Sequence, residues 1–157
     1  MLRSSRYLCA LALFALPVTA SAAPRQVPYW ASIRAKIVNM RKGPAPAYPI
    51  AWVYKRQQLP LKVLRLKEGW RLVQDQDGEQ GWILAQFLSP DRSAVVTGQG
   101  MTEMHAEAGG AGKMLWQVEP GVVGKLGPCG AGWCRFDVGA GHVGFVAQSR
   151  LWGAGEP

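Results

Sequence analysis

The protein has 157 residues, of which 48% are hydrophobic, and a formal net charge of +8. Its long apolar run lies at the N-terminus, so the rest of the chain predicts no stable membrane span. The sequence contains neither a Gly-x-Ser-x-Gly nor a His-Glu-x-x-His motif, which argues against the hydrolases and metalloproteases that use them. The basic balance favours an anionic partner, although a solvated surface explains the single charges equally well.

The first 22 residues are typical of a secretory signal peptide. Arg3 and Arg6 precede an apolar run at residues 7–18, and Ala20-Ser21-Ala22 has the pattern of a cleavage site. Cleavage after Ala22 predicts a periplasmic or secreted protein. An uncleaved membrane anchor is the alternative, but the apolar run is shorter than the roughly 20 residues that a span needs.

The charge of the mature chain is unevenly distributed. Residues 23–91 contain eleven Lys and Arg against five Asp and Glu, whereas residues 92–157 contain five of each. The first half is therefore the better candidate for contact with an anionic partner.

Short runs rich in Val, Ile, Leu and aromatic residues alternate with Gly, Pro and Asp, which predicts an all-β protein. We expect a lead-in segment at residues 23–32 and a first module at residues 33–89. The strands of this module are predicted at residues 34–40, 50–56, 61–66, 70–76 and 80–84. A proline-rich loop at residues 44–49, a hairpin turn at Asp77-Gly78 and a helical turn at residues 85–88 complete a small, partly open barrel.

A short linker at residues 90–92 leads into a second module at residues 94–152. Its predicted strands are residues 94–96, 114–118, 122–126, 133–138 and 143–147. Residues 153–157 are expected to form a frayed tail.

The two modules are related by an internal repeat. Residues 68–88 match residues 131–151 at an offset of 63 without a gap, and Gly69-Trp70 falls on Gly132-Trp133. Two copies of one supersecondary unit therefore predict two small β-barrels in tandem.

The mature chain has two cysteines, Cys129 and Cys134. Export favours a disulfide between them, and closing so short a loop contributes about 2 kcal/mol. A metal site that also uses His105 and His142 is the alternative, but the Cys-x4-Cys spacing is only loosely typical of zinc. A nucleophile–base pair of Cys134 and His142 conflicts with the disulfide, so we expect a non-enzyme without a metal or other cofactor.

The first module resembles the bacterial SH3 domain. The segments that carry the resemblance are VNMRKGPAPAYP at residues 38–49, EGW at 68–70 and DGEQGWILAQFL at 77–88. The matching positions are Asn39, Arg41, Gly43, Pro44, Trp70, Gly81, Trp82, Ile83 and Leu88. The second module keeps only the C-terminal half of this pattern and has the Gly-rich segment 98–112 in place of the Asn-x-Arg-x-Gly-Pro loop, which indicates a divergent copy.

The resemblance implies an exported, non-enzymatic targeting module with a shallow aromatic groove beside the long loop. We expect Tyr48, Trp52, Tyr54 and Trp70 to form its floor, because Trp52 and Tyr54 share one face of a strand. The alternative is that half of these aromatic residues pack under the loop. We expect Trp82 to pack in the core.

Two cations of the long loop, Arg41 and Lys42, are expected to line the groove and to meet ligand carboxylates. The alternative for Arg41 is a structural one, in which it donates hydrogen bonds to carbonyl groups of its own loop.

The leading hypothesis is a module that binds a cell-envelope ligand, above all the peptidoglycan stem peptide or another anionic envelope component. A periplasmic protein–protein adaptor that takes an extended or Pro-rich segment is the alternative. Export argues against a nucleic-acid partner.

Overall fold

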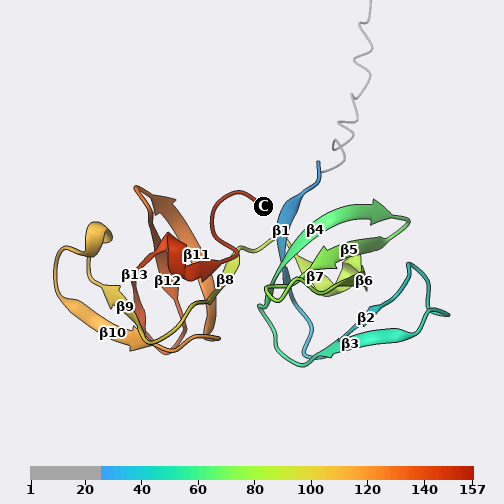
Figure 1. Cartoon of the computed structure of the whole chain (residues 1–157), viewed down its shortest axis with the longest axis horizontal. Helices are drawn as coiled ribbons and strands as arrows, with labels where there is room; N and C mark the ends of the chain where they lie inside the picture. The colour runs from blue at the N-terminus through green and yellow to red at the C-terminus, as the bar shows by residue number, and fades with distance from the viewer. Residues whose placement is uncertain (1–25) are drawn as a thin grey trace, which may run out of the picture.

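The computed structural model describes residues 26–157. The predicted signal peptide and its cleavage site at residue 22 lie outside this range. The described chain is built from β-strands that form two seven-stranded antiparallel sheets, with three short 3-10 turns (Figure 1). This confirms the predicted all-β fold with two tandem modules. Within residues 26–157, no helix is long and apolar enough to cross a membrane.

The first sheet has the strand order β3-β2-β6-β5-β4-β1-β7. Its strands are β1 (Tyr29–Ile33), β2 (Val38–Arg41), β3 (Ile50–Tyr54), β4 (Pro60–Lys67), β5 (Trp70–Gln74), β6 (Gln80–Leu84) and β7 (Leu88–Ser89). The 3-10 turn η1 (Ala85–Phe87) joins the last two strands, as predicted for residues 85–88. Strand β3 lies at one edge of this sheet, and the two-residue strand β7 lies at the other.

The second sheet repeats this order as β10-β9-β13-β12-β11-β8-β14. Its strands are β8 (Ser93–Val96), β9 (Thr102–His105), β10 (Met114–Val118), β11 (Val123–Gly130), β12 (Trp133–Asp137), β13 (Val143–Ala147) and β14 (Leu151–Trp152). Two 3-10 turns, η2 (Ala108–Gly110) and η3 (Gln148–Arg150), complete the module. The structural repeat therefore covers the whole module and extends well beyond the 21 residues that match in sequence.

Each module has its own hydrophobic core. In the first module, alternate residues of β4 and β5 point inward, and Leu61, Val63 and Val73 are fully buried. In the second module, Phe136 and Val146 occupy the matching inner face. Full burial of each such side chain contributes about 1.5–3 kcal/mol, so the alternating pattern selects which sheet face becomes the core.

Two strands, β1 and β9, differ from the sequence prediction. The supposed lead-in segment contains β1, which pairs with β4 through Ala31 and Leu61 and with β7 through Ile33 and Leu88. Strand β9 lies in the Gly-rich segment 98–112, which was expected to be a loop. It forms a strand because Thr102 and Met104 alternate with more exposed polar residues and are buried.

The glycines that open β6 and β13 have a shared structural role. A Cβ on Gly81 would lie 2.9 Å from the carbonyl oxygen of Arg41, and a Cβ on Gly144 would lie 2.9 Å from that of His105. Only glycine allows the backbones of neighbouring strands to approach so closely. This close approach explains why both copies have Gly before an aromatic residue.

Cys129 and Cys134 form a disulfide, which confirms the predicted pairing. The two residues are cross-strand partners on β11 and β12, on either side of the turn that joins these strands. Among the described residues, no group of three or more His, Cys, Asp or Glu side chains is arranged to hold a metal ion.

The two modules contact each other through Trp30 of β1. Its indole Nε1 donates a hydrogen bond to the carbonyl of Gly155 at 3.1 Å, and its ring packs edge-to-face on Trp152 with centroids 4.8 Å apart. Figure 1 shows the C-terminal segment curling from the second module toward β1. The residues expected to form a frayed tail, 153–157, are therefore docked between the modules.

Two arginines add hydrogen bonds at this junction. Arg92 Nη2 donates to the carbonyls of Gly153 at 2.8 Å and Gly155 at 3.2 Å, and Arg56 Nη1 donates to that of Gly121 at 2.9 Å. Burial lowers the pKa of Arg92, an effect that nearby Glu156 opposes. The short linker and these contacts together hold the modules side by side.

We expect Trp30→Ala to lower the free energy of unfolding by about 3 kcal/mol, because it removes a buried ring that joins both modules. Urea unfolding followed by circular dichroism measures this change. Trp52→Ala is the matched control, since 57% of the Trp52 side chain is exposed and its truncation should cost less than about 0.5 kcal/mol. Equal losses in the two variants would contradict a role for Trp30 in joining the modules.

Candidate ligand-binding surface of the first module

The free edge of the first sheet carries an exposed apolar surface. Strand β3 lies at this edge, and its outer side has no strand partner in the described chain. The exposed fractions are 47% for Tyr48, 46% for Ile50, 57% for Trp52 and 39% for Val53. So many large apolar side chains in one short segment are uncommon on a monomeric protein and indicate a contact surface. We call these four residues the aromatic edge.

The loop between β2 and β3 holds Tyr48 in place. The backbone N–H of Tyr48 donates a hydrogen bond to the carbonyl of Ala45, and the backbone N–H of Lys42 donates one to the carbonyl of Pro49. The Tyr48 ring lies directly over Gly43, where any Cβ would collide with it. The Gly-Pro pair of this loop therefore leaves room for the ring, which is presented to solvent beside β3.

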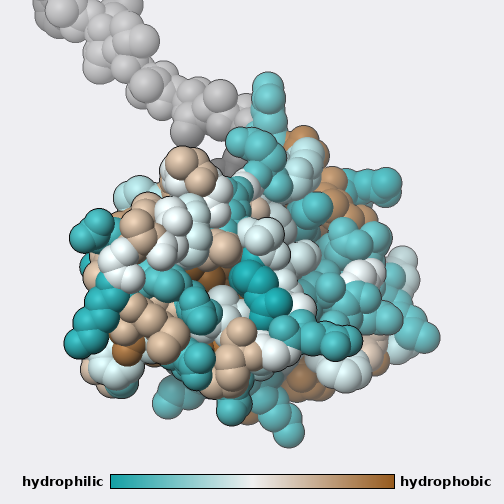
Figure 2. Space-filling view, turned by 60° about the vertical axis from the view of Figure 1, so that its left-hand side comes forward, coloured by the Kyte–Doolittle hydropathy of each residue, from teal (hydrophilic) through white to brown (hydrophobic). Residues whose placement is uncertain are grey.

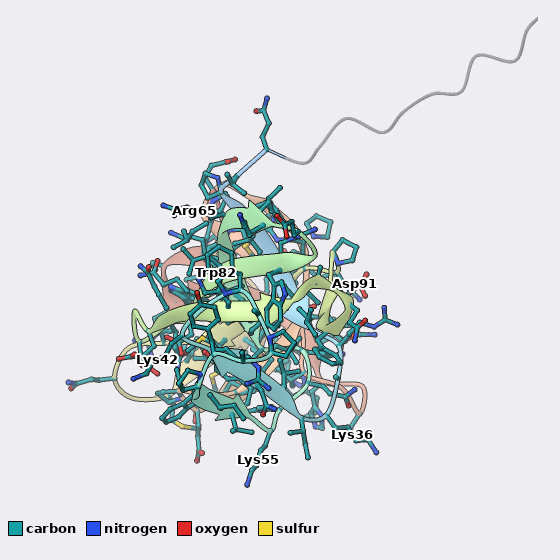
Figure 3. All side chains as sticks on the ribbon, turned by 90° about the vertical axis from the view of Figure 1, so that its right-hand side faces the viewer. Lys36, Lys42, Lys55, Arg65, Trp82 and Asp91 are labelled. Carbon is teal, nitrogen blue, oxygen red and sulfur yellow. A yellow bond between two sulfur atoms is a disulfide. The ribbon has the colours of Figure 1, made fainter. Side chains whose placement is uncertain are left out.

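Arg41 has the structural role that was the alternative in the sequence analysis. Its Nη1 donates a hydrogen bond of 2.7 Å to the carbonyl of Tyr48 and so clamps the two ends of the loop together. Lys42 next to it is exposed. Figure 3 shows Lys42 and Lys55 projecting outward at the periphery of the first module, with Trp82 near its centre. Of the two predicted loop cations, Lys42 is the one free to meet a ligand carboxylate.

Tyr54 shares a strand face with Trp52, as predicted, but it is buried. Its hydroxyl donates a hydrogen bond of 2.8 Å to Asp75 Oδ2, while Asp75 Oδ1 accepts the backbone N–H groups of Asp77 and Glu79. Burial, first of all, and the neighbouring Asp75 raise the pKa of Tyr54 well above its usual range. Alternation along β3 therefore predicted correctly that Trp52 and Tyr54 share a face. Of these two residues, only Tyr54 is buried, and its hydroxyl bonds to Asp75 in the turn between β5 and β6.

Trp70 is also buried, with only 7% of its surface exposed. It is the cross-strand partner of Leu84, and the next pair on the same face is Leu72 with Trp82. Trp82 is half-buried, so the expectation that it belongs to the core is wrong in degree. The predicted four-residue aromatic floor is therefore divided, with Tyr48 and Trp52 exposed and Tyr54 and Trp70 buried.

A small groove adjoins Trp52 on the side of the second module. It has a volume of about 190 Å³ and is lined by Trp52, Tyr54, Pro60, Asp77 and, from the second module, Val95, among others. The groove continues the aromatic edge toward an acidic turn. Lys42 therefore lies near the loop end of β3, and the carboxylates of Asp75 and Asp77 lie at the opposite end.

The second module has a matching surface that the sequence analysis missed. Strand β10 is the free edge of its sheet and exposes Met114 (45%), Leu115 (37%) and Trp116 (41%). Trp52 and Trp116 occupy equivalent positions, because each is the cross-strand partner of a buried Met, Met40 and Met104. They lie 64 residues apart, one more than the offset of 63 in the sequence repeat, so the repeat did not align them. Trp116 packs edge-to-face against His142, with centroids 4.3 Å apart. Figure 2 shows hydrophobic residues as small patches within a mainly hydrophilic face.

We expect Tyr54→Phe to lower the free energy of unfolding by about 1–2 kcal/mol, because Asp75 loses a hydrogen bond in a partly buried place. Thermal and urea unfolding measure the change. Tyr48→Phe is the control, since the exposed hydroxyl of Tyr48 should contribute less than about 0.5 kcal/mol. A stability of Tyr54→Phe equal to that of the control would show that the hydrogen bond to Asp75 is unimportant.

The match to a protein family agrees with this architecture. The family model of the bacterial SH3 domain matches residues 34–90 and 99–153. Among solved structures, the chain is similar to NlpC2 from Trichomonas vaginalis, with 14% identity and a TM-score of 0.35 over 82% of this chain and 49% of that one. It is similar to NlpC1 from the same organism with the same identity and TM-score, over 83% of this chain and 47% of that one.

The chain thus spans about half the length of these two solved proteins. No curated protein matches the chain. The two family matches lie on the two sheets and together cover more than half of the sequence. The protein therefore belongs to the bacterial SH3 domain family, with two tandem copies of the domain.

Proposed function

We propose that the protein is a non-enzymatic binding protein of the cell envelope whose first module recognises the peptidoglycan stem peptide. The observation that carries this proposal is the aromatic edge, where Tyr48 and Trp52 stand exposed on a strand without a partner. Membership of the bacterial SH3 family supports a binding role. The predicted signal peptide and the disulfide support a location outside the cytoplasm.

The edge offers three kinds of interaction to an extended peptide. The unpaired N–H and C=O groups of β3 can take up a further strand, which is a common mode of peptide recognition. Trp52 and Tyr48 supply flat apolar contact area at a low cost in conformational entropy. Lys42 supplies a positive charge for the carboxylates that stem peptides carry. Arg41 acts indirectly, because its hydrogen bond shapes the loop that presents Tyr48.

A protein–protein adaptor is the second candidate function, and one observation favours it. Both modules present an apolar free edge, at β3 and at β10, with a Trp at the equivalent position. Two such edges suit a partner protein with two extended apolar segments, since linked sites raise the overall affinity.

Co-sedimentation of the mature protein with purified peptidoglycan sacculi tests the leading proposal. We expect Trp52→Ala to weaken binding by about 30-fold, because an exposed Trp in the middle of a contact surface typically contributes about 2 kcal/mol. Ile37→Ala is the matched control, since Ile37 is 64% exposed but lies outside the aromatic edge. It should bind as the unmodified protein does.

The salt dependence of binding separates a specific contact from a general attraction of charges. We expect binding by the aromatic edge to persist at 0.5 M salt, where exposed charges are largely screened. Binding that disappears with salt, or that is equal in Trp52→Ala and the control, would contradict the proposal. Absence of binding to protein-free sacculi at any salt concentration would favour the adaptor.

A further inference from the structure

A second potential binding site lies between the two modules, away from the aromatic edge. It is a polar cleft of about 920 Å³, lined by the connection after β1, residues 57–58, the linker and strand β11. This volume lies within the usual range for small-molecule sites. The cleft is held by the same contacts of Trp30, Arg56 and Arg92 that join the modules. Its two walls therefore come from different domains of the chain.

Positive charge dominates the cleft. Arg34, Arg92 and Lys125 line it, against a single carboxylate from Asp91, which already accepts the hydroxyl of Ser89 at 2.7 Å. Across residues 26–157, the ion pairs are Lys67 with Glu68 and, when His105 is protonated, His105 with Glu103. No cation of the cleft is therefore ion-paired within the described chain. Such an arrangement attracts an anion.

The hydroxyl of Ser93, one of the residues that line the cleft, has no hydrogen-bond partner among the described residues. Ser93 is only 4% exposed, and its Oγ is buried without a donor or acceptor in the described chain. A buried hydroxyl without a partner is unfavourable and uncommon in folded proteins. A ligand oxygen that accepts the Ser93 proton would remove this cost. The hydroxyl is thus an observation independent of the charges, and it points to the same kind of ligand.

The internal repeat shows what differs at this place. Ser93 pairs with Lys125 across β8 and β11, and in the first module Trp30 pairs with Lys62 at the equivalent position. There the Lys62 ammonium lies 5.5 Å from the centroid of the Trp30 ring. Replacement of the Trp by Ser leaves Lys125 without this ring and places a small hydroxyl beside it. Directly opposed side chains in antiparallel strands are close enough to hold one ligand group together.

We propose that this cleft binds a small polar ligand with at least two carboxylate or phosphate groups, held by Arg34 from one module and by Lys125 and Ser93 from the other. The ligand would bridge the two domains. Arg92 is engaged with the carbonyls of the C-terminal segment and serves to keep the cleft open in its present shape. This site differs from the aromatic edge in chemistry, because it recognises charge rather than apolar surface.

Isothermal titration calorimetry of the mature protein with citrate and with pyrophosphate tests the proposal and distinguishes carboxylate from phosphate recognition. We expect saturable binding of at least one anion at a 1:1 ratio. Arg34→Gln and Lys125→Gln should each weaken it about tenfold, since each removes a charge-assisted hydrogen bond. Lys36→Gln is the matched control, because Lys36 is an exposed cation two residues from Arg34 that does not line the cleft.

The Ser93→Ala variant separates a role in binding from a role in stability. We expect this variant to unfold at the same or a higher temperature, because the unpaired hydroxyl is removed, and yet to bind the anion several-fold more weakly. Circular dichroism of each variant confirms the fold. Sedimentation with sacculi should be unchanged in the Lys125→Gln variant, so the two proposals fail separately.

Three outcomes would overturn the proposal. The first is that neither anion shows saturable binding at concentrations up to about 10 mM, which would mean a dissociation constant above about 10 mM. The second is an equal loss in Lys36→Gln and Lys125→Gln, which would mean a diffuse attraction to a basic protein. The third is unchanged affinity in Ser93→Ala together with unchanged affinity in Arg34→Gln.

Discussion

The indole of Trp30 is the contact on which the arrangement of the two modules depends. The ring belongs to the first strand of the first module, yet it packs on Trp152 and donates to Gly155 at the end of the second. A buried Trp with a satisfied N–H combines a large apolar contact with a directional bond. The short linker and this contact hold the two modules against each other. The polar cleft, whose lining comes from both modules, is therefore a fixed feature of the fold.

The equivalent position in the second module is Ser93, and this one difference breaks the symmetry of the repeat. In the first module Trp30 joins the domains and lies under Lys62. In the second module the same place has a hydroxyl that finds no hydrogen-bond partner within residues 26–157, and Lys125 is its cross-strand neighbour. The two copies of the domain thus differ at this position, which joins the domains in the first copy and has a buried hydroxyl in the second.

Much of the fold was predictable from the sequence, because the features that determine it are local. Gly81 and Trp82 recur as Gly144 and Phe145, and the close backbone approach at these glycines explains why the pattern survives duplication. Strand β1 was missed because its partners, β4 and β7, lie far along the chain, so its burial is not a local property. The docking of residues 153–157 was missed for the same reason, since Gly155 has no sequence signature and meets Trp30 only in three dimensions.

The candidate site was predicted in part, and the division follows from what alternation can and cannot decide. Period-two alternation placed Trp52 and Tyr54 on one face correctly. It does not show which part of that face another segment covers, and the turn held by Asp75 closes over Tyr54 alone. Burial of Trp70 likewise depends on neighbours outside its strand. Long-range packing therefore determines which residues of one strand face are buried and which stay exposed.

The two surfaces of the protein respond differently to their surroundings, and this follows from their composition. The aromatic edge depends on contact area and on main-chain groups, which salt affects little. The cleft depends on unpaired cations, whose attraction falls as ionic strength rises. A bridging anion in the cleft would add to the contacts of Trp30 without touching β3. Under the two proposals, the fold separates recognition of an extended apolar chain at β3 from recognition of a charged small molecule at the junction, where a bound anion would also stabilise the arrangement of the domains.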